Sequence, residues 1–407
     1  MKHRHSFLPT SGFTTVLAGA LLAAAALTTH AQTWETLATL GSPKGGNAVM
    51  IDPFSNPALP GLFIGGASSF GSVLHLDQST HPATLSSSDP TSYQVQRLGS
   101  DNSGNLYSVG YATLGSQSLW QVRKSQDGGV TWVIIDNAST WSPRGDSTAF
   151  GVTADSNGNI YVSGQAYFST TAKMPYWVIR KGANHGQSWS TVFTSSKAIA
   201  IGSAMKFVPD LPGKPGGVFG VGRQTPGGVT QWTVLRSRNS GQSWETVDAW
   251  TPAKNTAGIA TGVTSDHQGN LFVIGYDSGG QSTPGWYVRA SSDAGISWQT
   301  ILTNYSETSF SQTRPNDVAA DSNGSLYVVG VTGGLSNRTT WTVRRWDATM
   351  GTWDTWGDAL RFPLAPGLTW GVAARGVAVD AAGAVYITGR MSDVSSGFLV
   401  VQRLRAN

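Results

Sequence analysis

The sequence contains a series of similar segments, and lysines and arginines recur just before them. Such positively charged residues attract an anion as ligand. Six of the seven leading segments contain such a residue, including Lys44 and Lys197. The candidates for ligand binding are four from the leading segments and two that directly follow a recurring glycine: Arg144, Lys254, Arg314 and Arg375, then Arg223 and Arg390. Cations gathered around a funnel focus the electrostatic potential toward a carboxylate or sulfate. We predict that these six residues bind a ligand. In the alternative interpretation they are solvated loop charges, neutralised by Asp146, Asp277, Asp317 and Asp393.

Two carboxylates held roughly 5 to 10 Å apart would instead perform glycoside hydrolysis. Asp277 and Asp317 lie in adjacent repeats and are the candidate catalytic pair. Aspartates in loops more often form turns, which is the alternative for both. No clustered histidines and carboxylates indicate a metal, and a chain without cysteine has no thiolate chemistry, so we predict no cofactor.

The elements that would position these residues come from seven copies of one repeat. Each copy has an aromatic residue followed three positions later by glycine: Phe63/Gly66, Tyr107/Gly110, Tyr161/Gly164, Phe219/Gly222, Phe272/Gly275, Tyr327/Gly330 and Tyr386/Gly389. A turn aspartate precedes each aromatic: Asp52, Asp101, Asp155, Asp210, Asp266, Asp321 and Asp380. Such an aspartate, followed by a glycine that tolerates positive φ, connects two strands of a hairpin. On both sides of this turn apolar residues alternate with others along the chain, which predicts that the flanking segments are strands.

Two further strands complete each repeat. A second aromatic-led segment ends in arginine in six copies, as in Trp120 to Arg123, and a third segment starts at Trp132, Trp189, Trp244, Trp298 and Trp353. Four antiparallel strands in a unit of roughly 54 residues, repeated radially, make a β-propeller. We therefore predict an all-β fold, a single seven-bladed β-propeller of four-stranded antiparallel blades over residues 32–407.

The two ends of the chain predict how the ring closes. The last repeat supplies only three strands before Asn407, whereas Thr33 to Leu37 matches the outer strand that starts at Ser243. We therefore expect residues 32–40 to complete blade seven and to lock the ring, so that this terminus tolerates deletion poorly.

The first 31 residues have the features of a signal peptide. Lys2 and Arg4 give a basic start, Val16 to Leu27 is an apolar run, and Thr29 to Ala31 offers a cleavage site after Ala31. We predict a secreted or periplasmic protein without a membrane span. Cleavage removes 2 of 27 basic residues and leaves 25 against 23 acidic ones, a balance that argues against a nucleic-acid partner.

One turn of the repeat carries a signature. Ser125-Gln-Asp127-Gly-Gly129-Val-Thr131-Trp132 fits the pattern S-x-D-x-G-x-[ST]-W at every fixed position, and so does Ser291-Ser-Asp293-Ala-Gly295-Ile-Ser297-Trp298. This resembles the Asp-box (BNR) propellers, a superfamily that includes sialidases, some endoglucanases and non-enzymatic members. A site needs its residues once, whereas a scaffold needs them in every blade. We therefore interpret the fixed residues of both turns as structural.

Resemblance to sialidases would imply an arginine triad for the substrate carboxylate and a Tyr/Glu nucleophile pair. Arg144, Arg314 and Arg375 would supply the arginines, and Glu307 with the nearby Tyr305 is the candidate for the nucleophile pair. The segment leading into the first blade lacks the F/Y-R-I/L-P motif of sialidases, which argues against that activity.

In this strand order the hairpin turns of a blade share one end of the ring, and the other end carries loops that do not repeat. A unique site belongs to that second end, at the mouth of the central channel. We predict a non-catalytic binder of an extracellular glycan or other anionic or polar ligand, and a monomer. The alternatives are a glycan-active enzyme, as a glycoside hydrolase or a lyase, and a protein-interaction scaffold.

Overall fold

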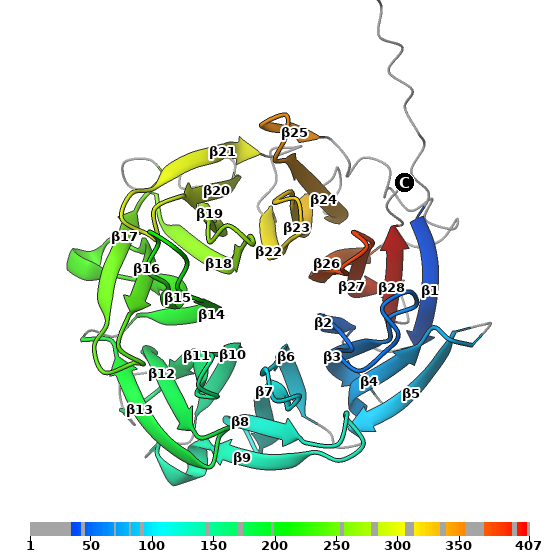
Figure 1. Ribbon diagram of the computed structural model, residues 1–407. Coiled ribbons are helices and arrows are strands. Elements are labelled where there is room, and N and C mark those ends of the chain that lie inside the picture. Colours follow the sequence, from blue (N-terminus) through cyan, green and yellow to red (C-terminus); the bar gives the residue numbers. More distant parts are fainter. Residues whose placement is uncertain are drawn as a thin grey trace, which may run out of the picture. The chain divides into compact units, whose positions relative to one another are not determined.

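Each of the seven sequence repeats forms one antiparallel sheet of four strands. The structure, a computed structural model, describes residues 34–41, 45–68, 71–80, 83–89, 93–142, 146–169, 174–196, 199–252, 256–277, 284–305, 313–333, 339–354, 370–392 and 397–404. Within these ranges, seven sheets follow one another and surround a common centre (Figure 1). The predicted seven-bladed propeller is therefore confirmed. The predicted signal peptide lies outside the described residues.

The first three blades each run from an innermost to an outermost strand in chain order. Blade one contains β2 (Gly46–Ile51), β3 (Leu62–Ser68), β4 (Gly71–Asp77) and β5 (Thr84–Asp89). Blade two contains β6 (Gln94–Ser100), β7 (Leu106–Leu114), β8 (Gln117–Ser125) and β9 (Val133–Asn137), followed by the 3-10 turn η1 (Ala138–Thr140). Blade three contains β10 (Ser147–Ala154), β11 (Ile160–Ala166), β12 (Tyr176–Ala183) and β13 (Ser188–Thr194).

The next three blades repeat this order. Blade four contains β14 (Ile201–Val208), β15 (Gly217–Gln224), β16 (Gln231–Ser237) and β17 (Glu245–Trp250), with the 3-10 turn η2 (Pro226–Gly228) between β15 and β16. Blade five contains β18 (Gly258–Ser265), β19 (Leu271–Asp277), β20 (Trp286–Ser291) and β21 (Gln299–Tyr305). Blade six contains β22 (Arg314–Ala320), β23 (Leu326–Gly333), β24 (Thr339–Asp347) and β25 (Thr352–Asp354).

Blade seven joins the two ends of the chain. Its inner strands are β26 (Trp370–Val379), β27 (Val385–Ser392) and β28 (Gly397–Leu404), and its outer strand is β1 (Trp34–Gly41). β1 pairs antiparallel with β28 from Trp34 opposite Leu404 to Gly41 opposite Phe398. The side chain of Arg403 adds an ion pair with Glu35, its Nε lying 3.1 Å from Oε2. The predicted closure of the ring by the N-terminal strand is confirmed.

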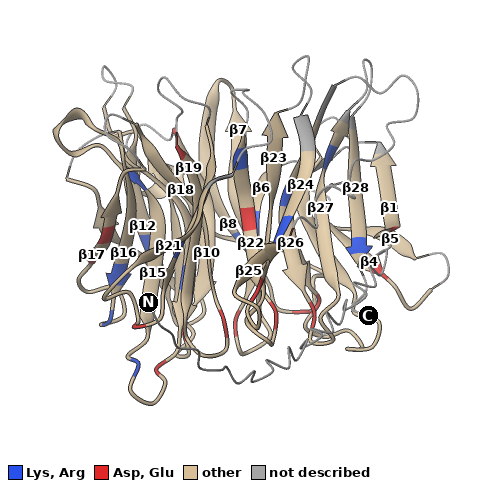
Figure 2. Cartoon of the chain, turned by 90° about the horizontal axis from the view of Figure 1, so that it is seen from above, with Lys and Arg blue, Asp and Glu red and all other residues tan. Residues whose placement is uncertain are grey.

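The turn aspartates hold the hairpins between the first and second strands. Asp155 accepts hydrogen bonds from the backbone N–H groups of Asn157 and Asn159 and from the hydroxyl of Tyr161, each at 2.9 Å. Gly158 in the same turn has a φ of +74°, which glycine adopts without strain. One aspartate therefore fixes both the turn and the buried aromatic of the second strand. Figure 2 shows acidic residues gathered along this end of the sheets.

The recurring arginine of the third strand joins consecutive blades. The guanidinium of Arg180 in blade three lies 2.6 Å from the carboxylate of Asp136 on the outer strand of blade two. Arg289 in blade five makes the same contact at 2.7 Å with Asp248 of blade four. These arginines therefore act between sheets, away from the channel.

The two turns that resemble Asp boxes are held by their own side chains. Asp127 accepts hydrogen bonds from the Thr131 hydroxyl at 2.5 Å, the Thr131 N–H at 2.9 Å and the Ser125 hydroxyl at 2.8 Å. These bonds, led by that from the Thr131 hydroxyl, lower the pKa of Asp127 to about 2. Asp293 makes the equivalent bonds with Ser297 and Ser291. The aspartates of these turns are thus occupied locally.

Replacing Asp127 by Ala should lower the Tm at neutral pH because the turn loses all three bonds. The folded-state pKa lies below the ordinary value of 3.8, so the contribution of Asp127 is present above that value and is lost as the pH falls toward 2. Thermal unfolding followed by circular dichroism should therefore show the Tm difference narrowing between pH 4 and pH 2. The matched control is Asn239→Ala, at the equivalent but uncharged position of blade four, whose Tm difference should not narrow. A difference that stays constant for Asp127→Ala would contradict this account.

Deleting residues 32–40 should abolish cooperative unfolding, because β28 then becomes an exposed edge and the ring loses its closure. Scanning calorimetry of the shortened chain should give a broad transition at lower temperature. Glu35→Ala is the control: it keeps the strand pairing and removes only a partly exposed ion pair, worth about 1 kcal/mol or less. An unchanged transition in the shortened chain would refute the role given to β1.

Candidate functional site

Every innermost strand contains an extra residue near its middle or start where it pairs with the second strand, and β26 has a further irregularity between Trp370 and Ala373. The register between the two strands shifts by one position at the extra residue; this is a β-bulge, which turns that residue away from the regular ladder. The seven extra residues, called here the bulge ring, are Asn47, Gln96, Phe150, Ser203, Thr261, Asn316 and Arg375. In contrast to the turn residues, they differ in chemistry from blade to blade.

All seven residues of the bulge ring line one cavity of about 330 Å³, together with Arg97, Ile201 and Arg314. Because every blade contributes a residue, the cavity lies in the centre of the ring. The bulges lie ahead of the turn aspartates on the inner strands, so the cavity belongs to the end of the channel opposite the hairpin turns. This is the mouth at which a site was predicted.

The cavity has a cationic side and an apolar side. Arg314 and Arg375 come from blades six and seven, whereas Phe150 and Ile201 come from blades three and four. Asn47, Gln96 and Thr261 come from blades one, two and five, which lie between these two sides. A ligand in the cavity would therefore meet positive charge on one side and an aromatic ring on the other.

The arginines of blades six and seven act on one another electrostatically. Burial lowers the pKa of Arg375, and the positive charges of Arg314 and Arg390 lower it further. Arg375 Nη1 donates to Oδ1 of Asn47, whose Nδ2 in turn donates to the carbonyl of Val95 at 2.9 Å. Arg314 is exposed, and the buried Nε of Arg390 has no hydrogen-bond partner among the described residues. An anion placed here would offset the repulsion that Arg314 and Arg390 exert on Arg375.

Arg97 and Asp317 form an ion pair between blades two and six, with Nη1 and Oδ2 2.8 Å apart. The backbone N–H of Val377 donates to the same carboxylate oxygen at 3.1 Å. Burial raises the pKa of Asp317, while the charge of Arg97 and the Val377 hydrogen bond oppose that shift. Asp317 is therefore held by Arg97 in the channel.

The other predicted carboxylates lie in different surroundings. Asp277, at the end of β19, is buried and accepts hydrogen bonds from the N–H of Gly285 at 2.8 Å and the hydroxyl of Tyr287 at 3.3 Å. Burial first, and then the charge of Asp277, raise the pKa of Tyr287 to about 12. Asp277 thus holds the connection between β19 and β20, and Asp317 has separate partners. Glu307 lies outside the described residues, as does the side chain of Tyr305.

The predicted cations divide into three groups. Arg314 and Arg375 line the cavity, and Arg390 lies close enough to Arg375 to influence its pKa. Arg223 on β15 pairs in register with Ile201, which is a lining residue. Arg144 and Lys254 lie outside the described residues.

Apart from Arg375, sequence reasoning missed the residues of the bulge ring, and it also missed Arg97. A signal was present: in six blades the bulge residue lies five positions before the turn aspartate, and in blade four, seven positions before it. This position does not repeat in residue type although its surroundings do. An alignment of the seven repeats on the turn aspartate would have identified this variable position.

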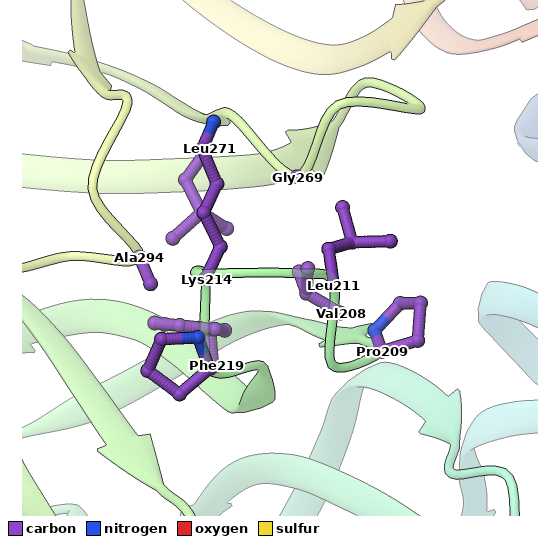
Figure 3. Close-up of a pocket in the computed structure, with 9 residues that line it drawn as sticks. Val208, Pro209, Leu211, Lys214, Phe219, Gly269, Leu271 and Ala294 are labelled. Carbon is purple, nitrogen blue, oxygen red and sulfur yellow. The ribbon is translucent and has the colours of Figure 1, made fainter.

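A second hollow lies at the turn end, where Leu211 and Lys214 of blade four cover Gly269 and Leu271 of blade five (Figure 3). Lys214 Nζ donates to the Gln268 carbonyl at 3.1 Å and to Asn270 Oδ1 at 2.9 Å. The hollow encloses no space for a water molecule, so it is a packing contact between blades.

In the part of the chain that the structure describes, no group of three or more histidine or carboxylate side chains is placed to hold a metal ion. None of the described helices has the length and apolar character needed to cross a membrane.

Comparisons with known proteins identify the architecture. No protein-family model matches the chain, and no curated protein matches it in sequence. Among solved structures it resembles a GH74 xyloglucanase from Xanthomonas campestris, with a TM-score of 0.53, 12% identity and coverage of 89% of this chain and 54% of that one. It also resembles Sqt1 of Saccharomyces cerevisiae, with a TM-score of 0.50, 10% identity and coverage of 91% and 99%. A Trypanosoma rangeli sialidase matches with a TM-score of 0.44 and 13% identity over 77% of this chain and 54% of that one. At such identities the first two likenesses show the fold alone.

Replacing Asn47 by Ala should lower the free energy of unfolding by about 1–2 kcal/mol, because both the Val95 carbonyl and the buried Arg375 lose a hydrogen bond. Chemical denaturation measures this difference. The matched control is Gln96→Ala at the next bulge, whose side chain makes no hydrogen bond within the described residues and should change stability by less than about 0.5 kcal/mol. Equal losses at the two positions would contradict the hydrogen-bonding role of Asn47.

Proposed function

We propose that this protein binds a small anionic ligand, such as the carboxylate- or sulfate-bearing residue of an extracellular glycan, in the cavity of the bulge ring, without catalysis. The observation that carries the proposal is the position of Arg314 and Arg375 in the wall of a cavity to which every blade contributes one residue. Export of the protein is part of the proposal and rests on the sequence of residues 1–31.

The charges of the cavity support an anion as the ligand. Arg314 and Arg390 both repel Arg375, whereas Arg97 is neutralised by Asp317. The wall next to blades six and seven therefore carries net positive charge. A carboxylate or sulfate that accepts two guanidinium hydrogen bonds gains about 1.5–3 kcal/mol from each charge-assisted bond.

The remaining lining residues support a polar ligand with an apolar face. Gln96 offers an amide group, Ser203 offers a hydroxyl group, and Phe150 offers an aromatic ring. A sugar ring combines hydroxyl edges with C–H faces and would use both. This combination favours an acidic sugar over an inorganic anion alone.

The cavity supports binding more than hydrolysis. Its described lining residues carry no carboxylate, and the neighbouring Asp317 is engaged by Arg97. Two carboxylates on either side of a glycosidic bond are what a glycoside hydrolase requires. A glycan-active enzyme therefore remains the second candidate, to be distinguished by experiment.

We also propose that the chain is an Asp-box propeller. The support is the shared hydrogen bonding of the turns that contain Asp127 and Asp293, in which serine and threonine side chains bond the aspartate in the same pattern. Solved structures that combine this pattern with the bulge ring would strengthen that assignment.

Arg314→Ala and Arg375→Ala should each weaken binding of an acidic glycan identified on a glycan array by about tenfold or more, the loss of about 1.4 kcal/mol or more. Isothermal titration calorimetry measures the affinity, and a parallel assay for new reducing ends detects hydrolysis. Arg314 is exposed, so its replacement should leave the Tm unchanged.

Two further variants serve as controls in this experiment, one outside the cavity and one that fills it. Arg238→Ala removes an exposed arginine at the turn end and should not alter binding. Ser203→Phe fills the cavity with a side chain that blade three already carries at the same position, and should abolish binding while the protein stays folded. Full binding by Ser203→Phe would overturn the site, and release of reducing ends would replace the binding function by the enzymatic one.

A further inference from the structure

The position that follows the bulge separates two blades from the other five. Five blades have a small residue there: Ala48, Gly151, Ala204, Gly262 and Gly376. Blades two and six have Arg97 and Asp317. These two charged side chains pair with each other. At Gly151 and Gly376 a side chain would meet the backbone of the neighbouring innermost strand, at Ala204 and Ala48 respectively, so these positions need a small residue.

The pair crosses the ring. Blades two and six are not neighbours, because blades one and seven separate them on one side and blades three to five on the other (Figure 1). Both side chains come from innermost strands, and they are only 19% and 15% exposed. Arg97 also lines the cavity, and the Asp317 carboxylate accepts a hydrogen bond from Val377 of blade seven, so the pair lies beside the cavity and reaches from blade two to the inner strands of blades six and seven.

Stability does not account for the pair. A buried ion pair contributes little net stability, because removing both charges from water costs about as much as their attraction returns. Burial raises the pKa of Asp317 even with the guanidinium 2.8 Å away, which reflects that cost. The five blades with Ala or Gly at this position pack without it.

We propose that the Arg97–Asp317 pair is a floor that closes the channel beneath the anion site, so that the cavity accepts a free small anion or the end of a chain and excludes internal segments of a polymer. The inference rests on the proposed function of the cavity. Asp317 is then a positioning residue that holds Arg97 across the channel. A cavity of about 330 Å³ is at the small end of ligand pockets, which suits one terminal residue.

The test uses D-galacturonate and linear oligogalacturonates of increasing length as probes, with the mature full-length protein. Calorimetry should give one protein per chain at every length, because each chain presents one suitable end. A number of proteins per chain that grows with length would show internal binding and overturn the floor.

The double variant Arg97→Ala/Asp317→Ala removes both side chains of the pair and tests the floor directly. It keeps the net charge and copies the small residues of the other blades, so the ring should stay folded. Removing the floor and the Arg97 donors should weaken monomer binding about tenfold and allow more than one protein per long chain. The charge-swapped double variant Arg97→Asp/Asp317→Arg rebuilds the floor and should restore one protein per chain. Wild-type stoichiometry and affinity in the Ala/Ala variant would overturn the proposal.

Failure of the proposed function has a different signature. If the wild type binds none of the galacturonate probes and none of the glycans on the array, the anion site itself is refuted. Chemical unfolding then tests whether the two side chains form a bridge. Arg97→Ala and Asp317→Ala should each lower the free energy of unfolding, and the charge-swapped double variant should recover most of that loss. Additive effects without recovery would show that the two residues do not form a bridge.

Discussion

Burial between neighbouring blades is the constraint on which this structure depends. The apolar clusters lie between consecutive sheets: Trp177 of blade three packs with Met205 of blade four, and Tyr386 of blade seven packs with Ile64 of blade one. A sheet at an open end would expose one such face and one strand edge. The contact between blades seven and one removes the exposed faces. The pairing of β1 with β28 ties both ends of the chain to that contact.

The same constraint explains where the molecule can differ from blade to blade. Residues that pack between sheets recur because every interface is alike, as with the buried Trp120, Trp177 and Trp232 of the third strands. The bulge ring lies at the inner edge of the sheets and lines the cavity, so it is not packed between the sheets. Asn47, Thr261 and Asn316 still donate to a backbone carbonyl of the next blade, whereas the other blades carry different residues at this position. The individual chemistry of the protein is therefore concentrated in the cavity of the bulge ring, and the pair of Arg97 and Asp317 lies beside it.

The repeated part of the fold was predictable, because it rests on local chemistry. A turn aspartate and a glycine appear in the sequence as they do in the hairpin, and Asp155 bonds the groups expected of it. The closing strand was predictable because its residues match those of another blade. The predicted Arg314 and Arg375 line the cavity, since the segments that carry them lead into innermost strands.

What could not be predicted depends on the curvature of the whole ring. Within any single repeat Asn47 and Phe150 look like ordinary strand residues, and only the closed ring brings them to one cavity. Arg97 and Asp317 lie far apart in the sequence and on blades that are not neighbours, and only the closed ring brings them within 2.8 Å. Asp317 therefore looked like a candidate for acid–base chemistry until its partner was known. Asp277 likewise bonds a loop N–H that no sequence pattern specifies.

The most direct test of the central claim is a crystal structure of the mature protein with an acidic sugar. Density for the carboxylate between the guanidinium groups of Arg314 and Arg375, with the sugar resting above Arg97, is the predicted result. A cavity that holds only water while the sugar occupies the blade rims or the turn end would contradict the claim that this ring of unlike residues is the binding site.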